Sequence, residues 1–372
     1  MSGKTGNVKT TAAVAAPIPG AAFDDPRTRW HRRLSFRNMS AVYILGLIVV
    51  IFAVWVPHTF LNADVQKSLL DTSSLNALVA IGLVIPLAAG VINLAIGAEV
   101  GLASIIAAWL LSKQGMPIVP TVLLTLLGGG VVGAVSALLV TKAHIDSIIA
   151  TLGLSSVLLA LIQWVSGSQQ ILNLGDKFQT LGTGDIVGIT YPVWVMLVVA
   201  VVVWYVLERT PAGRRVYATG GNFDAARLAG VKISRVIVLS LIACGVIAAA
   251  AGTLASSRLA TGDPTIGPSF LLPAYAAAFL GSTQFRGGRY NVWGTVVAVY
   301  VLAEGVKGLQ LAGAPTWIPD LFNGAALLLA VGLAKYQGLS IRGGARRISR
   351  RGGAEPSATA PGVSSGDDAD PR

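Results

Sequence analysis

Residues 119–140 read VPTVLLTLLGGGVVGAVSALLV and contain no charged side chain. A helix of this length crosses the hydrocarbon core of a bilayer, which takes about 20 residues. Gly128, Gly130 and Gly133 form a G-x-G-x-x-G pattern, but no strand-to-helix turn surrounds it, so it does not indicate a dinucleotide-binding loop. Gly129 and Gly133 have the spacing at which small residues let helices approach closely in lipid. The stretch therefore predicts a transmembrane helix in close contact with a neighbour.

The whole chain repeats this apolar pattern. Of its 372 residues, 53% are hydrophobic and only 12% are charged, and its mean hydropathy is +0.69. Such a composition is typical of a membrane protein rather than a soluble domain. An all-α polytopic fold with about ten spans is predicted, over residues 41–56, 75–92, 96–111, 119–140, 148–165, 191–207, 236–256, 270–284, 292–311 and 318–334. The third and eighth runs are short, which suggests tilted, broken or re-entrant helices.

Lysine and arginine residues predict the orientation, because positively charged loops remain in the cytoplasm. Three basic clusters lie before the first run, between the sixth and seventh runs, and after the tenth. They consist of Arg27, Arg29, Arg32, Arg33 and Arg37; Arg209, Arg214, Arg215, Arg227, Lys232 and Arg235; and Arg342, Arg346, Arg347, Arg350 and Arg351. Even numbers of spans separate the clusters, so both termini are predicted to be cytoplasmic. The net charge of +11 thus reflects membrane topology, and no nucleic acid is expected as a partner.

The sequence divides into three regions. Residues 1–40 form a basic cytoplasmic tail, and residues 41–337 form the transmembrane domain, which a cytoplasmic loop at 208–235 interrupts. Residues 338–372 are polar and rich in Gly, Ser and Pro, so we predict a disordered cytoplasmic tail. No signal-peptide pattern precedes the first apolar run, which is expected to remain as an anchor.

Side chains that could form an enzymatic or metal site are sparse. Cys244 is the only cysteine and lies in an apolar run, so we predict that it packs in the core. His31, His58 and His144 have neither ligand nor triad spacing, and no ATP-binding loop is visible. We therefore expect no catalytic residue and no metal site. Two classes of protein remain: an ion-coupled secondary transporter, or the membrane subunit of a transporter that a separate ATPase powers.

The stretch GGNFDAARLAG, residues 220–230 in the cytoplasmic loop, favours the second class. Asn222 is a good helix N-cap, Asp224 places negative charge in the first turn, and Gly230 can end the helix. We predict a short helix over Phe223–Ala229. A helix of that length is marginal in water, so it needs a packing partner.

This loop resembles a motif in the permease subunits of bacterial ABC importers for monosaccharides, of the ribose and xylose type. The family's pattern is approximately G-G-N-x-x-A-A-R-L-x-G-I, and residues 220–231 follow it. Residues 279–289 resemble a second family motif, L-G-G-T-S-x-x-G-G-x-G. The matching positions there are Gly281, Thr283, Gly287 and Gly288.

Further matches lie at residues 149–153 and 89–97, so the resemblance covers most of the chain between the second and tenth spans. Asn93, Ala95 and Ser282 depart from the family, which usually has Asp, Ser and Gly at these positions. All three departures lie outside the cytoplasmic loop, which keeps the family's pattern.

The resemblance implies a set of partners in the bacterial cytoplasmic (inner) membrane. Two permease copies would form the pore within the lipid, a cytoplasmic ABC ATPase would dock below, and an extracytoplasmic sugar-binding protein would deliver substrate above. ATP and Mg would be used by the ATPase, and this chain would bind no cofactor. The implied coupling residues are Gly220, Gly221, Asn222, Phe223, Ala225, Ala226, Arg227, Leu228 and Gly230. The small alanines would seat the helix in a groove, and Arg227 would pair with an acidic side chain.

Residues for the translocation pathway come from polar side chains within the spans. Glu304 and Lys307 lie i,i+3, where they would share a helical face and neutralise one another. Asn93 and Glu99 flank the short connection between the second and third runs, where a broken helix would expose backbone polar groups. Gln163 offers an amide beside an aromatic ring. The sequence does not specify the sugar, and branched-chain amino acids or nucleosides remain alternative substrates.

Overall fold

The computed structural model describes residues 40–55, 60, 62–284 and 288–332. The predicted tails and their basic clusters, as well as Gly287 of the second family motif, lie outside these residues. Helices occupy all ten predicted stretches. Their bounds are α2 (Ser40–Trp55), α4 (Ala63–Ala88), α5 (Ile96–Ser112), α6 (Ile118–Thr141), α7 (Ser147–Ser166), α9 (Tyr191–Arg209), α12 (Ile233–Leu259), α13 (Leu271–Gln284), α14 (Val292–Leu311) and a last helix, Ile318–Gly332.

Six of these helices are long and apolar enough to cross a membrane, namely α4, α6, α7, α9, α12 and α14. The helix α5 has 17 residues and α13 has 14, in agreement with the predicted short third and eighth spans. The helix α4 begins well before the expected residue 75, because Asn62 caps it and accepts a hydrogen bond from the Asp64 N–H. Its first turns are polar, which is why hydropathy placed its start too late.

The helix α12 lies at the centre of the bundle and packs against α4, α5 and α6. Glycines bring α6 and α12 together: a Cβ on Gly129 would lie 2.4 Å from the carbonyl oxygen of Gly245, and one on Gly133 would lie 2.4 Å from that of Leu241. The close helix contact predicted from the glycine spacing is confirmed. The core around it is built largely from small side chains such as Ala248 and Ala251, both fully buried.

Replacing Gly133 by alanine should destabilise the bundle, because the added methyl meets the α12 backbone. Overpacking of this kind costs about 1–3 kcal/mol. Gly128 provides a matched control on the same helix, since a Cβ there meets nothing within 4 Å. We expect a lower thermal unfolding midpoint in detergent for Gly133→Ala and an unchanged or slightly higher one for Gly128→Ala. Equal midpoints for the two variants would contradict the helix contact.

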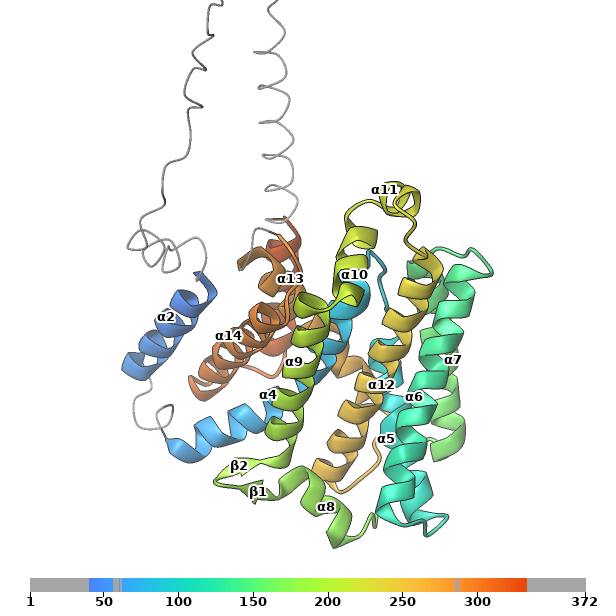
Figure 1. Ribbon diagram of the computed structural model, residues 1–372. Coiled ribbons are helices and arrows are strands. Elements are labelled where there is room, and N and C mark those ends of the chain that lie inside the picture. The colour runs from blue at the N-terminus through green and yellow to red at the C-terminus, as the bar shows by residue number, and fades with distance from the viewer. Residues whose placement is uncertain (1–39, 56–59, 61, 285–287, 333–372) are drawn as a thin grey trace, which may run out of the picture.

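The two ends of the bundle carry different elements (Figure 1). One end holds the helices α10 (Pro211–Gly221) and α11 (Phe223–Leu228), and the other holds α8 (Asp176–Thr183) with the strands β1 (Asp185–Ile186) and β2 (Ile189–Thr190). The basic loop 208–235 makes the α10–α11 end cytoplasmic. The opposite end is therefore extracytoplasmic, and it carries a short helix followed by a two-stranded antiparallel hairpin.

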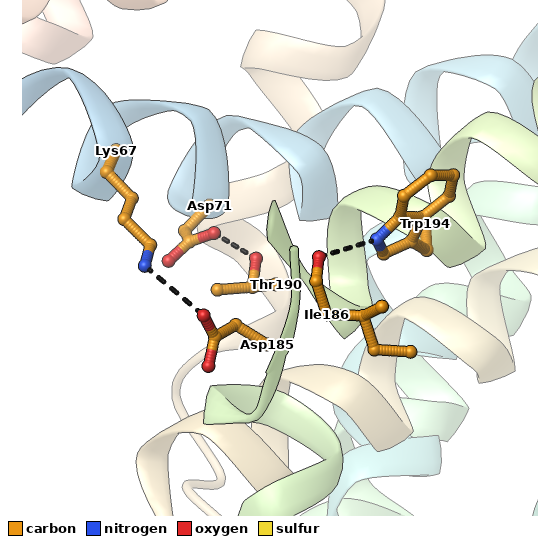
Figure 2. Close-up of polar contacts among 6 residues, drawn as sticks. All are labelled: Lys67, Asp71, Asp185, Ile186, Thr190 and Trp194. Carbon is orange, nitrogen blue, oxygen red and sulfur yellow. Dashed lines mark hydrogen bonds and ion pairs between the residues drawn. The ribbon is translucent and has the colours of Figure 1, made fainter. Parts of the chain in front are cut away.

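Polar contacts attach this hairpin to the start of α4 (Figure 2). The Thr190 hydroxyl donates to the Asp71 carboxylate, and Lys67 Nζ lies 3.8 Å from Asp185 Oδ2. Lys67 and Asp185 are about half exposed, so their ion pair adds little stability. The polar start of α4, which hydropathy excluded from the second span, is therefore the part that holds the extracytoplasmic hairpin.

Candidate coupling surface and translocation pathway

The cytoplasmic element has the helix, cap and stop predicted for residues 222–230. The Asn222 side chain accepts hydrogen bonds from the N–H groups of Asp224 and Ala225, each at 3.0 Å. Gly230 has a φ of +80°, and its N–H donates to the carbonyl of Arg227. This glycine therefore closes the helix in a left-handed conformation. The helix ends at Leu228, one residue before the predicted end, and Ala229 is its C-cap.

The helix α10, which precedes α11, was not predicted. Thr210 caps it by accepting a hydrogen bond from the Gly213 N–H, and Pro211 occupies its first turn. A threonine followed by proline is a helix start signal that could have been detected in the sequence. The predicted coupling residues Gly220 and Gly221 are the last two residues of α10.

The surface of α11 is largely exposed. Ala226 is buried, so this alanine packs the helix against its own chain rather than leaving it for a partner. Leu228 is 89% exposed and Phe223 is 40% exposed, and Arg227 lies exposed between them in the sequence. An apolar and cationic surface of this kind is available to a cytoplasmic partner.

The junction of α10 and α11 rests on the cytoplasmic end of α4. A Cβ on Gly220 would lie 2.2 Å from the carbonyl oxygen of Ala88, and one on Gly90 would lie 3.1 Å from the Phe223 ring. Gly90 also has a φ of +82°, which favours glycine. The α10–α11 junction is therefore in direct contact with residues 88–90.

A second contact joins α10 to the turn between α13 and α14. The Tyr217 hydroxyl donates to the carbonyl of Tyr290 at 2.7 Å, and the Arg289 guanidinium lies 4.3 Å from the Tyr217 ring centroid. Burial raises the pKa of Tyr290 to about 12. A cytoplasmic cavity of about 820 Å³ lies between these elements, and it is lined by Leu87, Ala88, Leu207, Glu208, Arg214, Tyr217, Ala218, Gly220, Gly221, Gly288, Arg289, Tyr290 and Asn291.

The described residues of the second family motif lie at the end of α13 and in the segment that leads into α14. A Cβ on Gly281 would lie 2.5 Å from the backbone nitrogen of Thr295, so this glycine lets α13 pack directly on α14. Asn291 caps α14, accepting from the Gly294 N–H at 2.6 Å and donating to the carbonyl of Gly281 at 3.3 Å. Gly288 has a φ of +90°, and the Thr283 hydroxyl donates to a carbonyl of its own helix. These residues shape the turn.

Residues 89–95 form a non-helical segment between α4 and α5. Side chains satisfy its backbone: the Ile92 N–H donates to Ser147 Oγ, and the Leu94 N–H donates to Thr151 Oγ1 at 3.0 Å. Irregular backbone within a membrane domain is tolerated only where such partners or water are present. The connection between the second and third spans is therefore a non-helical break after α4, and α7 supplies two hydroxyl groups that accept from its backbone.

Replacing Thr151 by valine removes the acceptor for the Leu94 N–H at nearly constant volume. A buried donor left unsatisfied costs about 1–3 kcal/mol, so the thermal unfolding midpoint should fall. Ser156→Ala is the matched control, since Ser156 is exposed on the same helix and its hydroxyl donates only within α7. A Thr151→Val variant as stable as the Ser156→Ala variant would exclude this role.

The eighth span is preceded by a second non-helical segment, residues 260–266, and a short 3₁₀ helix, η1 (Gly267–Phe270). This segment runs antiparallel along α5: a Cβ on Gly262 would lie 2.5 Å from the Ala108 side chain, and one on Gly267 would lie 2.5 Å from the carbonyl oxygen of Gly97. The break before α13 thus reaches the start of α5, where the break after α4 ends.

A buried polar cluster lies where the two breaks meet. Asn93 and Cys244 are fully buried, and Glu99 and Tyr275 are almost fully buried. The Asn93 side-chain nitrogen donates to Glu99 Oε1 at 3.2 Å and to Cys244 Sγ at 3.5 Å, and its oxygen accepts from the Ala95 N–H at 3.0 Å. The Tyr275 hydroxyl faces the Asn93 backbone, and within the described residues Glu99 Oε2 has no hydrogen-bond partner. The cluster therefore combines a satisfied amide with a carboxyl oxygen whose hydrogen-bonding capacity is unused.

The other predicted pathway residues lie apart from this cluster. Gln163 is exposed on α7, while Glu304 is buried and Lys307 is partly buried on α14. In the described part of the chain, no ion pair within 4.0 Å joins Glu304 to Lys307, so the expected neutralisation is not formed. The two residues share a helical face, but their charged groups do not meet. Cys244 and Tyr275 were not predicted for the site, because only tertiary contacts bring them to Asn93.

The helical membrane domain has two non-helical segments that meet at a buried polar cluster, and a cytoplasmic helix contacts one of them. This arrangement is typical of a membrane transport protein. Residues 67–331 match the family described as branched-chain amino acid transport system / permease component. The chain therefore belongs to this family of permease components. It is a multi-pass protein of the bacterial cytoplasmic membrane, and it is a transport subunit rather than an enzyme.

Relatives align with nearly their whole length. The ribose import permease protein RbsC of Bacillus subtilis is 34% identical over 290 residues, which cover 77% of this chain and 90% of that protein. The protein of the same name in Haemophilus influenzae is 30% identical over 300 residues, covering 80% and 93%. The D-allose transport system permease protein AlsC of Escherichia coli is 27% identical over 331 residues, covering 89% and 98%. No solved structure matches the chain.

Proposed function

We propose that this chain is the membrane permease subunit of an ATP-driven, binding-protein-dependent importer of monosaccharides. The observation that carries this proposal is the similarity, over most of the chain, to permeases whose names specify ribose, L-arabinose and D-allose. Branched-chain amino acids, which the family description names, are the alternative substrate class. Membership in a family of permease components argues against an ion-coupled secondary transporter.

The complex would contain a cytoplasmic ATPase, an extracytoplasmic sugar-binding protein and a second copy of this chain in the lipid bilayer. ATP and Mg would be bound by the ATPase, and the exposed surface of α11 would be its docking site. Leu228 and Phe223 offer apolar contact there, and Arg227 offers a cation for an acidic partner.

Coupling would follow the contacts that join α11 to the bundle. Movement of α11 would shift Gly220 and Phe223 against residues 88–90, and the break at 89–95 would then reposition Asn93 and Glu99. A break is a natural place for such a change, because its hydrogen bonds come from side chains rather than from a helix ladder.

The cluster of Asn93, Glu99, Cys244 and Tyr275 is our candidate for the substrate path. Its amide, carboxyl and hydroxyl groups are donors and acceptors that match the hydroxyl groups of a sugar. The cluster is buried here, so a solute would reach it only after the breaks move. Gln163, Glu304 and Lys307 stay as predictions for other parts of the path.

Uptake into proteoliposomes tests the proposed function. We expect transport of a radiolabelled pentose or hexose only when the ATPase, ATP and Mg and the binding protein are all present. An ATPase variant that binds but does not hydrolyse ATP is the control. Uptake by the chain alone under an ion gradient would overturn the proposal, and selective uptake of leucine would support the alternative substrate class.

A further inference from the structure

A long groove separates α9 from α12 on the outer face of the bundle. Its volume is about 1090 Å³, and its walls are apolar along the two spans. On α9, Val198 and Val202 lie one turn apart and are both more than half exposed. On α12, Leu239 and Ala243 are likewise one turn apart. The spacing of four residues lines each wall with a continuous apolar stripe.

Three cations close the cytoplasmic end of this groove. They are Arg215 on α10, Lys232 just before α12, and Arg235 in the first turn of α12. All three are exposed, and in the described part of the chain none has an ion-pair partner within 4.0 Å. The described residues that line the groove include no aspartate or glutamate. The groove therefore joins an apolar slot at membrane level to an uncompensated positive mouth.

We propose that this groove binds an anionic phospholipid of the cytoplasmic leaflet. The acyl chains would lie along Val198, Val202, Leu239 and Ala243, and the phosphate would lie among Arg215, Lys232 and Arg235. Basic pockets between transmembrane helices on the cytoplasmic side have the chemistry that binds such headgroups. The N-terminus of α12 carries partial positive charge that no side chain caps, and this charge favours a phosphate there.

A second copy of this chain fits the groove less well. Its own segment at the same level carries Arg209, Arg214, Arg215, Arg227, Lys232 and Arg235 against Glu208 and Asp224. Contact there would bring like charges together, whereas a phosphate diester supplies the missing negative charge. Charge complementarity thus selects the lipid.

The test uses the full-length purified permease in detergent, with dioleoyl phosphatidylglycerol and dioleoyl phosphatidylcholine as probes of equal chain length. We expect native mass spectrometry to show one phosphatidylglycerol retained per chain in preference to phosphatidylcholine. Removal of one of these cations should weaken retention of phosphatidylglycerol roughly fivefold. The triple variant Arg215→Gln/Lys232→Gln/Arg235→Gln should weaken it on the order of a hundredfold. Inorganic phosphate should not compete at millimolar concentration, because it lacks the acyl chains.

Three further variants keep the test decisive if the triple variant does not fold. Lys142→Gln removes an exposed cation at the cytoplasmic end of α6, outside the groove, and should leave retention unchanged. Lys232→Gln alone should weaken phosphatidylglycerol only, whereas Ala243→Trp should exclude both lipids by filling the slot. Equal retention in the wild type and in Lys232→Gln would overturn the proposal. If the groove variants lose a permease dimer but retain phosphatidylglycerol as the wild type does, a second copy of the chain occupies the groove and the lipid proposal is overturned.

Discussion

Replacing Gly220 by valine is expected to lower ATP-driven uptake at least tenfold while the permease still inserts into the membrane. The added Cβ would lie 2.2 Å from the carbonyl oxygen of Ala88 and 3.0 Å from the Gly90 nitrogen. Both are backbone atoms, so α10 and α11 must move away from α4. We expect at least a tenfold loss of uptake, on the order of what a misplacement of about 1 Å causes in a reaction that depends on geometry.

Three measurements are needed to interpret this variant: sugar uptake into proteoliposomes with the full complex, co-purification of the ATPase, and the thermal unfolding midpoint. The informative comparison is Gly221→Val, because a Cβ on Gly221 meets nothing within 4 Å of its own chain. Gly221→Val should retain the thermal stability of the wild type, so any loss of uptake in it would report the docking surface. Normal uptake by Gly220→Val would exclude the α4 contact as the coupling route.

The positions of the helices could be predicted from the sequence because lipid imposes a strong constraint on composition. Each apolar run became a helix, and the two runs predicted to be short became helices preceded by a non-helical segment. The helix boundaries that were predicted wrongly lie where a helix includes polar residues. The first turns of α4 and all of α10 are polar, so hydropathy missed them, although capping residues mark both starts.

Only part of the candidate site could be predicted, because two of its four residues lie far from the other two in the sequence. Asn93 and Glu99 are six residues apart, so one broken connection brings them together. Cys244 and Tyr275 come from helices more than 150 residues away, and an apolar run gives no sign that its cysteine will accept a hydrogen bond. The Glu304 and Lys307 pair shows the converse: a shared helical face does not by itself bring two charged groups within 4.0 Å.

The hydrogen bonds of Asn93 make it the residue on which the break after α4 depends most. Substitution by leucine would leave the Ala95 N–H without its acceptor and both Glu99 oxygens without a partner among the described residues. Leaving a buried hydrogen-bonding group without its partner costs about 1–3 kcal/mol, and more when the group is charged. We expect Asn93→Leu to unfold at a markedly lower temperature and to lose at least tenfold in sugar uptake.

Exchanging the amide and the carboxyl group between positions 93 and 99 tests the hydrogen bond separately from side-chain size. Asn93→Asp alone places two carboxyl groups at the 3.2 Å contact, where like charges repel, and should transport poorly. Asn93→Asp combined with Glu99→Gln restores one donor and one acceptor in reversed positions, and the aspartate still accepts from the Ala95 N–H. We therefore expect the double variant to recover stability and at least part of the uptake. If the two substitutions are instead additive in the unfolding midpoint, Asn93 and Glu99 act independently, because coupled residues in contact deviate from additivity.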